Sequence, residues 1–169
     1  MKTRVILTLC VVFVLAMVAN AGAQATLIAG SAEDRAFTAI TNEQNLDNKI
    51  KLCLDFEKEF QKSKVLPDIY VMLVTAYTDK GDKAKVDEVG EKALKIDPDN
   101  FTILMAVSRS YGMQKKDLAR ANTYAQRAVE VLDQRKAEQK YKDDAAWKAY
   151  IDSIATSAKA NLTWIKTIH

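Results

Sequence analysis

Apolar residues recur at steps of three and four along most of the chain, and this spacing predicts helices. Two buried faces show the pattern most clearly, one over residues 46–62 and one over residues 145–168. The first comprises Ile50, Leu52, Cys53, Phe56 and Phe60, and the second comprises Trp147, Tyr150, Ile151, Ile154, Ala158, Leu162 and Ile165. Strand-like alternation is absent, and the few Gly and Pro residues leave long uninterrupted helices. The pattern therefore predicts an all-α fold.

Turn and capping residues divide the remaining sequence into helices over residues 31–41, 67–80, 83–96, 101–113 and 118–141. Pro67 suits a helix start, Gly81 supplies the left-handed residue that ends a helix, and Asp82 can cap the next one. The segment Asp97-Pro98-Asp99-Asn100 stops one helix and caps another. In the helix over 83–96 we expect a buried stripe: Val86, Val89, Gly90, Ala93 and Ile96. We expect Gly90 and Ala93 to be small because the two helices of one repeat approach closely there.

Two stretches of the chain repeat each other. The first begins Tyr70-x₂-Leu73-x₃-Tyr77, the second begins Leu104-x₂-Val107-x₃-Tyr111, and each is followed by a turn and a second helix containing small residues. Tyr77 and Tyr111 are 34 residues apart, and Ala93 and Ala128 are 35 residues apart. Repeats of this length with two helices per unit stack on their neighbours, and such stacks usually form binding surfaces.

These repeats resemble tetratricopeptide repeats (TPR), and residues 49–63 resemble the back half of an earlier repeat of the kind found in bacterial envelope proteins. The resemblance covers about residues 48–132, with a weaker extension to the C-terminus. It implies a right-handed helical-hairpin solenoid of about three TPR-like units with a C-terminal helix, in which front helices line a concave groove. We expect three regions: a signal peptide (1–25), a lead-in with a short helix (26–45) and the helical domain (46–169).

The first 25 residues have the pattern of a cleavable secretory signal peptide. Lys2 and Arg4 precede an apolar run over residues 5–19, and small residues suited to signal peptidase follow it. An uncleaved membrane anchor is the alternative, although the run is short for a span of about 20 residues. We therefore expect a periplasmic or secreted protein without stable membrane insertion after cleavage. Cys53 is then the remaining cysteine, either buried in the core or available for an intermolecular disulfide.

Composition argues against several classes of function. Removal of Lys2 and Arg4 lowers the formal net charge from +3 to +1. A net charge this small does not indicate binding to nucleic acid or to an anionic membrane. The only histidine is His169, so His-based triads and His-ligated zinc sites are not expected, and no phosphate-binding Gly loop is present. We therefore predict a protein that is not an enzyme and that binds neither a metal ion nor a cofactor.

The resemblance and helical geometry together give candidate binding residues. With Tyr70, Leu73 and Tyr77 packed inward, the groove side of the first front helix carries Val71, Thr75 and Thr78. The same argument gives Met105, Arg109 and Gly112 on the second front helix. Trp164 and Ile168 extend the apolar side of the last helix, where they either bury against the core or meet a partner. Among the groove residues, Arg109 alone could bind a carboxylate.

Two functions are consistent with these features. The first is a non-enzymatic interaction module of the bacterial cell envelope that binds a protein or peptide partner in the groove or through the C-terminal helix. The second is a self-assembling structural protein, a homo-oligomer, or a truncated relative of a longer repeat protein. An apolar terminal face and a repeat number near the minimum of about three motivate the second.

Overall fold

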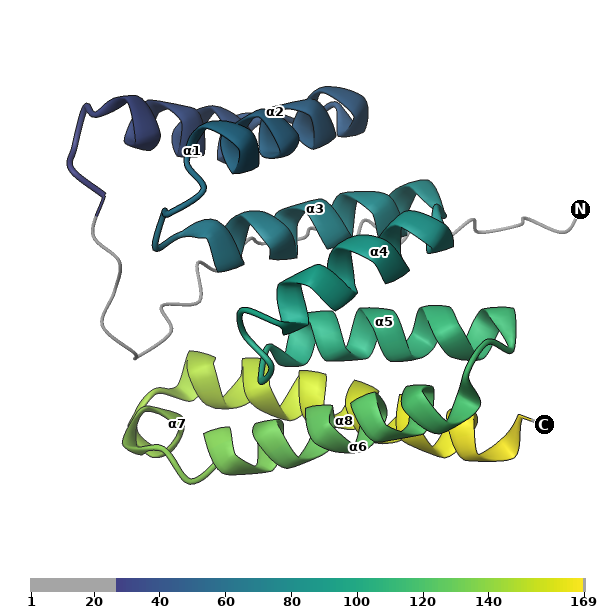
Figure 1. Cartoon of the computed structure of the whole chain (residues 1–169). Coiled ribbons are helices and arrows are strands. Elements are labelled where there is room, and N and C mark those ends of the chain that lie inside the picture. Colours follow the sequence, from purple (N-terminus) through teal and green to yellow (C-terminus); the bar gives the residue numbers. More distant parts are fainter. Residues whose placement is uncertain (1–26, 169) are drawn as a thin grey trace, which may run out of the picture.

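The computed structural model describes residues 27–168, and every regular element within them is a helix (Figure 1). The elements are α1 (Ala32–Asn42), α2 (Leu46–Glu59), α3 (Leu66–Lys80), α4 (Lys83–Leu94), α5 (Phe101–Gln114), α6 (Leu118–Arg135), α7 (Gln139–Asp143) and α8 (Ala145–Thr167). The all-α prediction is confirmed. The predicted signal peptide over residues 1–25 lies outside the described residues.

Local capping explains where most helices begin. The side chains of Asn45, Asp82, Asn100, Asp117 and Asp144 each accept a hydrogen bond from a backbone N–H in the first turn of the helix that follows. These bonds satisfy donors that have no partner inside the helix. At the end of α3, Gly81 adopts the left-handed conformation (φ 73°) that the sequence predicts for it.

The predictions of three helix ends and of the burial of Ile96 are wrong. The helix predicted over 118–141 ends at Arg135, and the short α7 follows it after an extended residue, Glu138. The helix over 46–62 ends at Glu59, and the helix over 83–96 ends at Leu94. Ile96 consequently lies beyond α4 and is 50% exposed instead of buried. After Leu94 the last turn tightens, because the N–H groups of Ile96 and Asp97 both donate to the Ala93 carbonyl at 2.9 Å.

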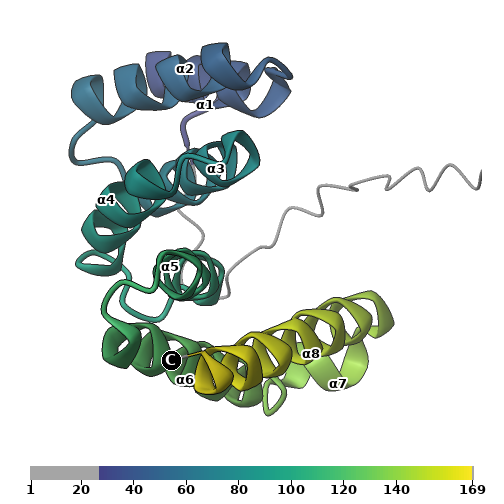
Figure 2. The ribbon, with the colours of Figure 1, turned by 90° about the vertical axis from the view of Figure 1, so that its right-hand side faces the viewer.

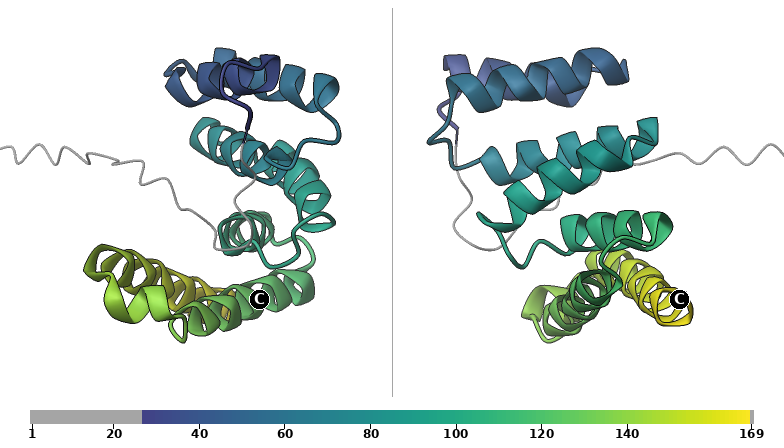
Figure 3. Two further views of the ribbon diagram at one scale, coloured as in Figure 1. Left: turned by 90° about the vertical axis from the view of Figure 1, so that its left-hand side faces the viewer. Right: turned by 45° about the vertical axis from the view of Figure 1, so that its right-hand side comes forward.

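The helices stack in sequence order into a C-shaped layer (Figures 2 and 3). Each of α2 to α5 packs on the helix that follows it, while α6 packs on α8. In addition, α3 contacts α5 and α5 contacts α8, which places these three helices together on the inner side of the C. Helices α4 and α6 lie on the outer side (Figure 2). Among the described residues, no helix has the length and apolar content needed to cross a bilayer.

One continuous core joins α1 to α6 and also contains Ile165 of α8, and a second cluster joins α5, α6 and α8. Tyr70, Leu73, Leu104 and Val107 are almost fully buried in the first, and Ile151 is buried in the second. Gly90 and Ala93 are buried, as predicted. The predicted close approach at Gly90 to the other helix of the same repeat, α3, is wrong, because the nearest side chains belong to α5. A Cβ atom at Gly90 would lie 2.2 Å from Cγ2 of Val107, so the two backbones approach closely because this position has no side chain.

Candidate protein-binding site

The predicted groove residues lie on α3 and α5, which contact each other. Thr75, Thr78 and Arg109 are exposed, whereas Val71 and Met105 are partly buried and pack against the core. The hydroxyl groups of Thr75 and Thr78 donate to backbone carbonyls one turn earlier on α3, at 2.8 Å each. These hydroxyls can therefore only accept a further hydrogen bond. We call these five residues together with Met113 the inner face.

Helix α5 leaves only a narrow strip of its surface free, because it packs against α3, α4, α6 and α8. Its exposed residues are Arg109, Met113 and Gln114. The Gln114 amide donates to Asp87 at 3.0 Å and so faces α4. Arg109 and Met113 are one turn apart on the free strip, with the partly buried Met105 one turn before them. The inner face is therefore an apolar and hydroxylated surface with a single arginine.

Arg109 differs from the other arginines of residues 27–168. Arg35, Arg120, Arg127 and Arg135 each donate to a carbonyl or carboxylate oxygen. Within these same residues, Arg109 makes neither a hydrogen bond nor an ion pair. A guanidinium group that is exposed and unpaired can bind a carboxylate with two parallel hydrogen bonds.

The C-terminal candidates lie together at the end of α5. A Cβ atom at Gly112 would lie 2.7 Å from Cζ3 of Trp164 and 3.2 Å from Cδ1 of Ile168. Both side chains therefore cover Gly112, which is buried and not free on the inner face. One edge of the Trp164 indole remains in solvent, since the residue is 36% exposed, and Met113 beside Gly112 in the chain is 54% exposed.

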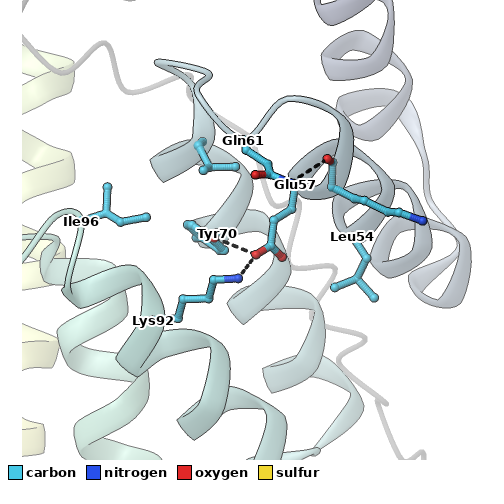
Figure 4. A pocket seen from close by; sticks show the side chains of 8 residues that line it. Leu54, Glu57, Gln61, Tyr70, Lys92 and Ile96 are labelled. Carbon is cyan, nitrogen blue, oxygen red and sulfur yellow. Dashed lines mark hydrogen bonds and ion pairs between the residues drawn. The ribbon is translucent and has the colours of Figure 1, made fainter.

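A recess between α2, α3 and α4 was not predicted from the sequence (Figure 4). Glu57 lies at its floor and accepts hydrogen bonds from the Tyr70 hydroxyl, at 2.9 Å, and from the Lys92 ammonium group. Leu54 and Ile96, which are 42% and 50% exposed, stand on opposite sides of it. We call this the outer recess; its lining residues are Leu54, Glu57, Lys58, Gln61, Leu66, Tyr70, Lys92 and Ile96.

Carboxylates on the helices of the outer side bind donors from the helices that follow them. Glu91 on α4 accepts from the hydroxyls of Tyr111, at 2.7 Å, and Tyr124, at 2.9 Å. Burial and then the hydrogen bond to Glu91 raise the pKa of both tyrosines to about 12. Burial likewise raises the pKa of Tyr70. These tyrosines remain protonated donors at neutral pH and therefore hold neighbouring helices together.

Asp87 on α4 is a buried carboxylate, 4% exposed. It accepts hydrogen bonds from the Ser110 hydroxyl at 2.6 Å, the Gln114 amide at 3.0 Å and the Lys116 ammonium group at 3.0 Å. All three donors belong to α5 or the turn after it, so Asp87 joins α4 to the following helix. Its role is structural, because its oxygens are already occupied by these donors.

Cys53 is buried as predicted, with no exposed surface. Burial raises the pKa of its thiol to about 11, which suppresses the reactive thiolate. The alternative of an intermolecular disulfide therefore requires a side chain that the fold does not expose. Among residues 27–168, no group of three or more His, Cys, Asp or Glu side chains is arranged to hold a metal ion.

Comparisons of the chain with protein-family models, with curated proteins and with solved structures found no match. The function is therefore inferred from the residues and the geometry described above.

Proposed function

We propose that this chain is a non-enzymatic protein-interaction module of the bacterial cell envelope, built as a TPR-like helical solenoid. The repeated Tyr and Ala positions support the repeat assignment, as does the alternation of helices between the inner and outer sides of the stack. The basic, apolar and small-residue pattern of residues 1–25 supports export to the periplasm or beyond the cell.

The proposed binding surface is the inner face. The observation that carries this proposal is Arg109, which is exposed and unpaired within residues 27–168 and flanked on α5 by Met105 and Met113. Methionine side chains adapt to different apolar partners, and arginine fixes a carboxylate by geometry. The partner is therefore a peptide or helical segment that places apolar side chains over the methionines and a carboxylate on Arg109.

A pair of threonines offers a matched test of this proposal. Thr75 on the inner face and Thr123 on α6 are both exposed, and each donates its hydroxyl to the carbonyl four residues earlier. A photo-crosslinking amino acid placed at either position therefore perturbs the fold to the same small extent. We expect a discrete adduct in intact envelopes from position 75 and none from position 123.

Arg109→Glu should abolish the adduct formed from position 75, because the substitution replaces attraction of a carboxylate with repulsion. The unfolding transition should stay within about 0.5 kcal/mol of the parent, since Arg109 holds no partner in the fold. Equal labelling from positions 75 and 123, or an adduct that survives Arg109→Glu, would contradict the proposal.

Self-association is a second candidate function, favoured by the exposed apolar surface of Trp164 and Met113 at the end of α5 and α8. Light scattering on the chain from residue 26, over a range of concentrations, separates the two. A defined dimer that Trp164→Ala dissociates would support self-association through this end. A monomer at every concentration would eliminate it and leave the inner face as the binding surface.

A further inference from the structure

The outer recess differs from the inner face in position and in chemistry. It lies between α2 and α4, and the N-terminal half of α3 and the segments that follow α2 and α4 supply its remaining lining residues. It also combines exposed aliphatic groups with lysines, whereas the inner face carries methionines, threonines and one arginine. The recess therefore requires its own explanation.

The apolar part of the recess is unusually exposed for this chain. Only five large hydrophobic residues within 27–168 are exposed, and two of them, Leu54 and Ile96, stand across the recess from each other. Leu66, which is buried, contributes to the lining between α2 and α4. An aliphatic side chain that enters the recess would remove part of this apolar surface from water, and that burial is favourable.

The charges that reach the mouth of the recess are positive. Glu57 is recessed, with 19% of its side chain exposed, and already accepts from Tyr70 and Lys92. Lys92 keeps 57% of its side chain in solvent. Lys58 is exposed and has no ion-pair partner among the described residues. A partner that enters here therefore meets the unpaired Lys58 ammonium group and the exposed side of the Lys92 ammonium group, which is already paired with Glu57.

We propose that the outer recess is a second docking site, which binds a protein segment presenting one branched aliphatic side chain flanked by carboxylates. The aliphatic group lies between Leu54 and Ile96, and the flanking carboxylates pair with Lys58 and Lys92. Two binding surfaces on opposite sides of one thin layer would allow this chain to join two partners at once.

The geometry favours a protein segment over the two other classes of partner. A small molecule would stay largely in water, because the aliphatic side chains flanking the site are themselves 42% and 50% exposed, whereas small-molecule sites enclose most of the ligand. An anionic bilayer presents a flat surface, which cannot fill a recess that has a carboxylate at its floor. Neither argument applies to a single projecting side chain from a protein.

The test uses a synthetic peptide with one isoleucine between pairs of glutamates, titrated into the ¹⁵N-labelled chain from residue 26. The peptide concentration rises to about 1 mM, because a single anchoring side chain gives weak binding. We expect amide shifts concentrated in α2 near Leu54 and Lys58 and around the C-terminal end of α4 near Lys92 and Ile96. A peptide with serine in place of isoleucine, and one with glutamine in place of glutamate, should each bind at least tenfold more weakly.

Surface variants test the assignment without a risk to folding. Ile96→Ser should weaken binding of the glutamate peptide about tenfold, the range expected when a central apolar contact is truncated. Ile28→Ser is the matched control, because Ile28 is also an exposed isoleucine, at 80%, and lies outside the recess. Lys58→Glu should weaken binding of the glutamate peptide more than Ile96→Ser does. Arg109→Glu should leave this binding unchanged, which separates the outer recess from the inner face.

Several outcomes would overturn the proposal. They are the absence of any shift at the highest peptide concentration, equal binding by Ile96→Ser and Ile28→Ser, and shifts confined to α3 and α5. Competition by phosphatidylglycerol vesicles, with the same amides broadened, would assign the surface to a membrane instead. The inner-face proposal would survive any of these results, because its crosslinking test uses different residues.

Discussion

Gly90→Ala tests the close approach of α4 and α5 most directly. An alanine Cβ at this position would lie 2.2 Å from Cγ2 of Val107 and 3.6 Å from Cγ2 of Ile103. Carbon atoms in contact lie about 3.5–4.0 Å apart, so the first distance cannot be maintained. Val107 is fully buried and its branched side chain has one preferred rotamer in a helix, so relief requires the helices to move apart.

The magnitude follows from two opposing effects. Overpacking a closely packed core costs about 1–3 kcal/mol, and the severity of this overlap favours the upper end. Alanine gains about 1 kcal/mol over glycine in helix propensity. We therefore expect Gly90→Ala to lower the free energy of unfolding by about 2 kcal/mol. With a urea dependence of about 2 kcal/mol per M, the unfolding midpoint should fall by about 1 M.

A double-mutant cycle with Val107→Ala distinguishes a steric clash from a general loss of stability. Val107→Ala alone removes buried methyl groups and leaves a space that the new Cβ of Gly90→Ala can occupy. The double variant should therefore be about 1–3 kcal/mol more stable than the sum of the single losses predicts. A neutral or stabilising Gly90→Ala, or additive losses in the double variant, would refute the close approach of α4 and α5.

Three further predictions concern buried polar groups. Asp87→Ala should lower the free energy of unfolding by about 2–4 kcal/mol, because it leaves three donors without their acceptor. Glu88→Ala, at an exposed carboxylate, should change it by less than about 0.5 kcal/mol. Urea unfolding measures both variants. Cys53 should react with a maleimide only as the chain unfolds, so rapid labelling of the native protein would contradict its burial and its pKa of about 11. The unfolding midpoint in urea should fall as the pH rises from about 9 to about 12, because the folded pKa values of Cys53, Tyr111 and Tyr124 are raised and the unfolded chain releases these protons first.

Features that depend on sequence neighbours were predicted well. The sequence predicts Asp82 as a cap, and it predicts a cap within the segment Asp97-Pro98-Asp99-Asn100, where Asn100 supplies it. A cap needs only its own side chain and the next three backbone N–H groups. Gly81 was recognised because a left-handed residue after a helix favours glycine. Burial of Cys53 and Ala93 followed from their positions in a stripe with helical period.

The end of α6 could not be predicted in the same way. Residues 135–142 contain Lys, Arg, Glu and Gln, which all favour helices, so local propensity continues the helix past Arg135. The buried stripe of α6 ends at Leu132, however, and the Tyr141 hydroxyl in α7 donates to Asp152 on α8 at 2.9 Å. The return of the chain onto α8 therefore decides where α6 ends, and this contact is not local.

The outer recess was missed for a related reason. Ile96 continues the apolar stripe of α4 by spacing alone, and only the early end of that helix turns it toward solvent. Leu54 follows Cys53 in the sequence and so lies about 100° further around the helix, off the buried face, where it stays 42% exposed. The amount of apolar surface left exposed depends on which helices are adjacent, and the pattern of a single helix does not contain this information.

The carboxylates of α2 and α4 show why charge on a helix is difficult to interpret from sequence. Glu57, Glu91 and Asp87 occupy helices rich in charged residues, where a solvated side chain is the ordinary expectation. Each instead accepts donors from helices further along the chain, over separations of 13 to 35 residues. Asp87 is buried, and Glu57 and Glu91 are partly buried. A carboxylate withdrawn from water is costly without donors, so these bonds favour one register of each helix against its neighbour. The polar contacts therefore specify how the helices stack, while the apolar stripes determine that they stack at all.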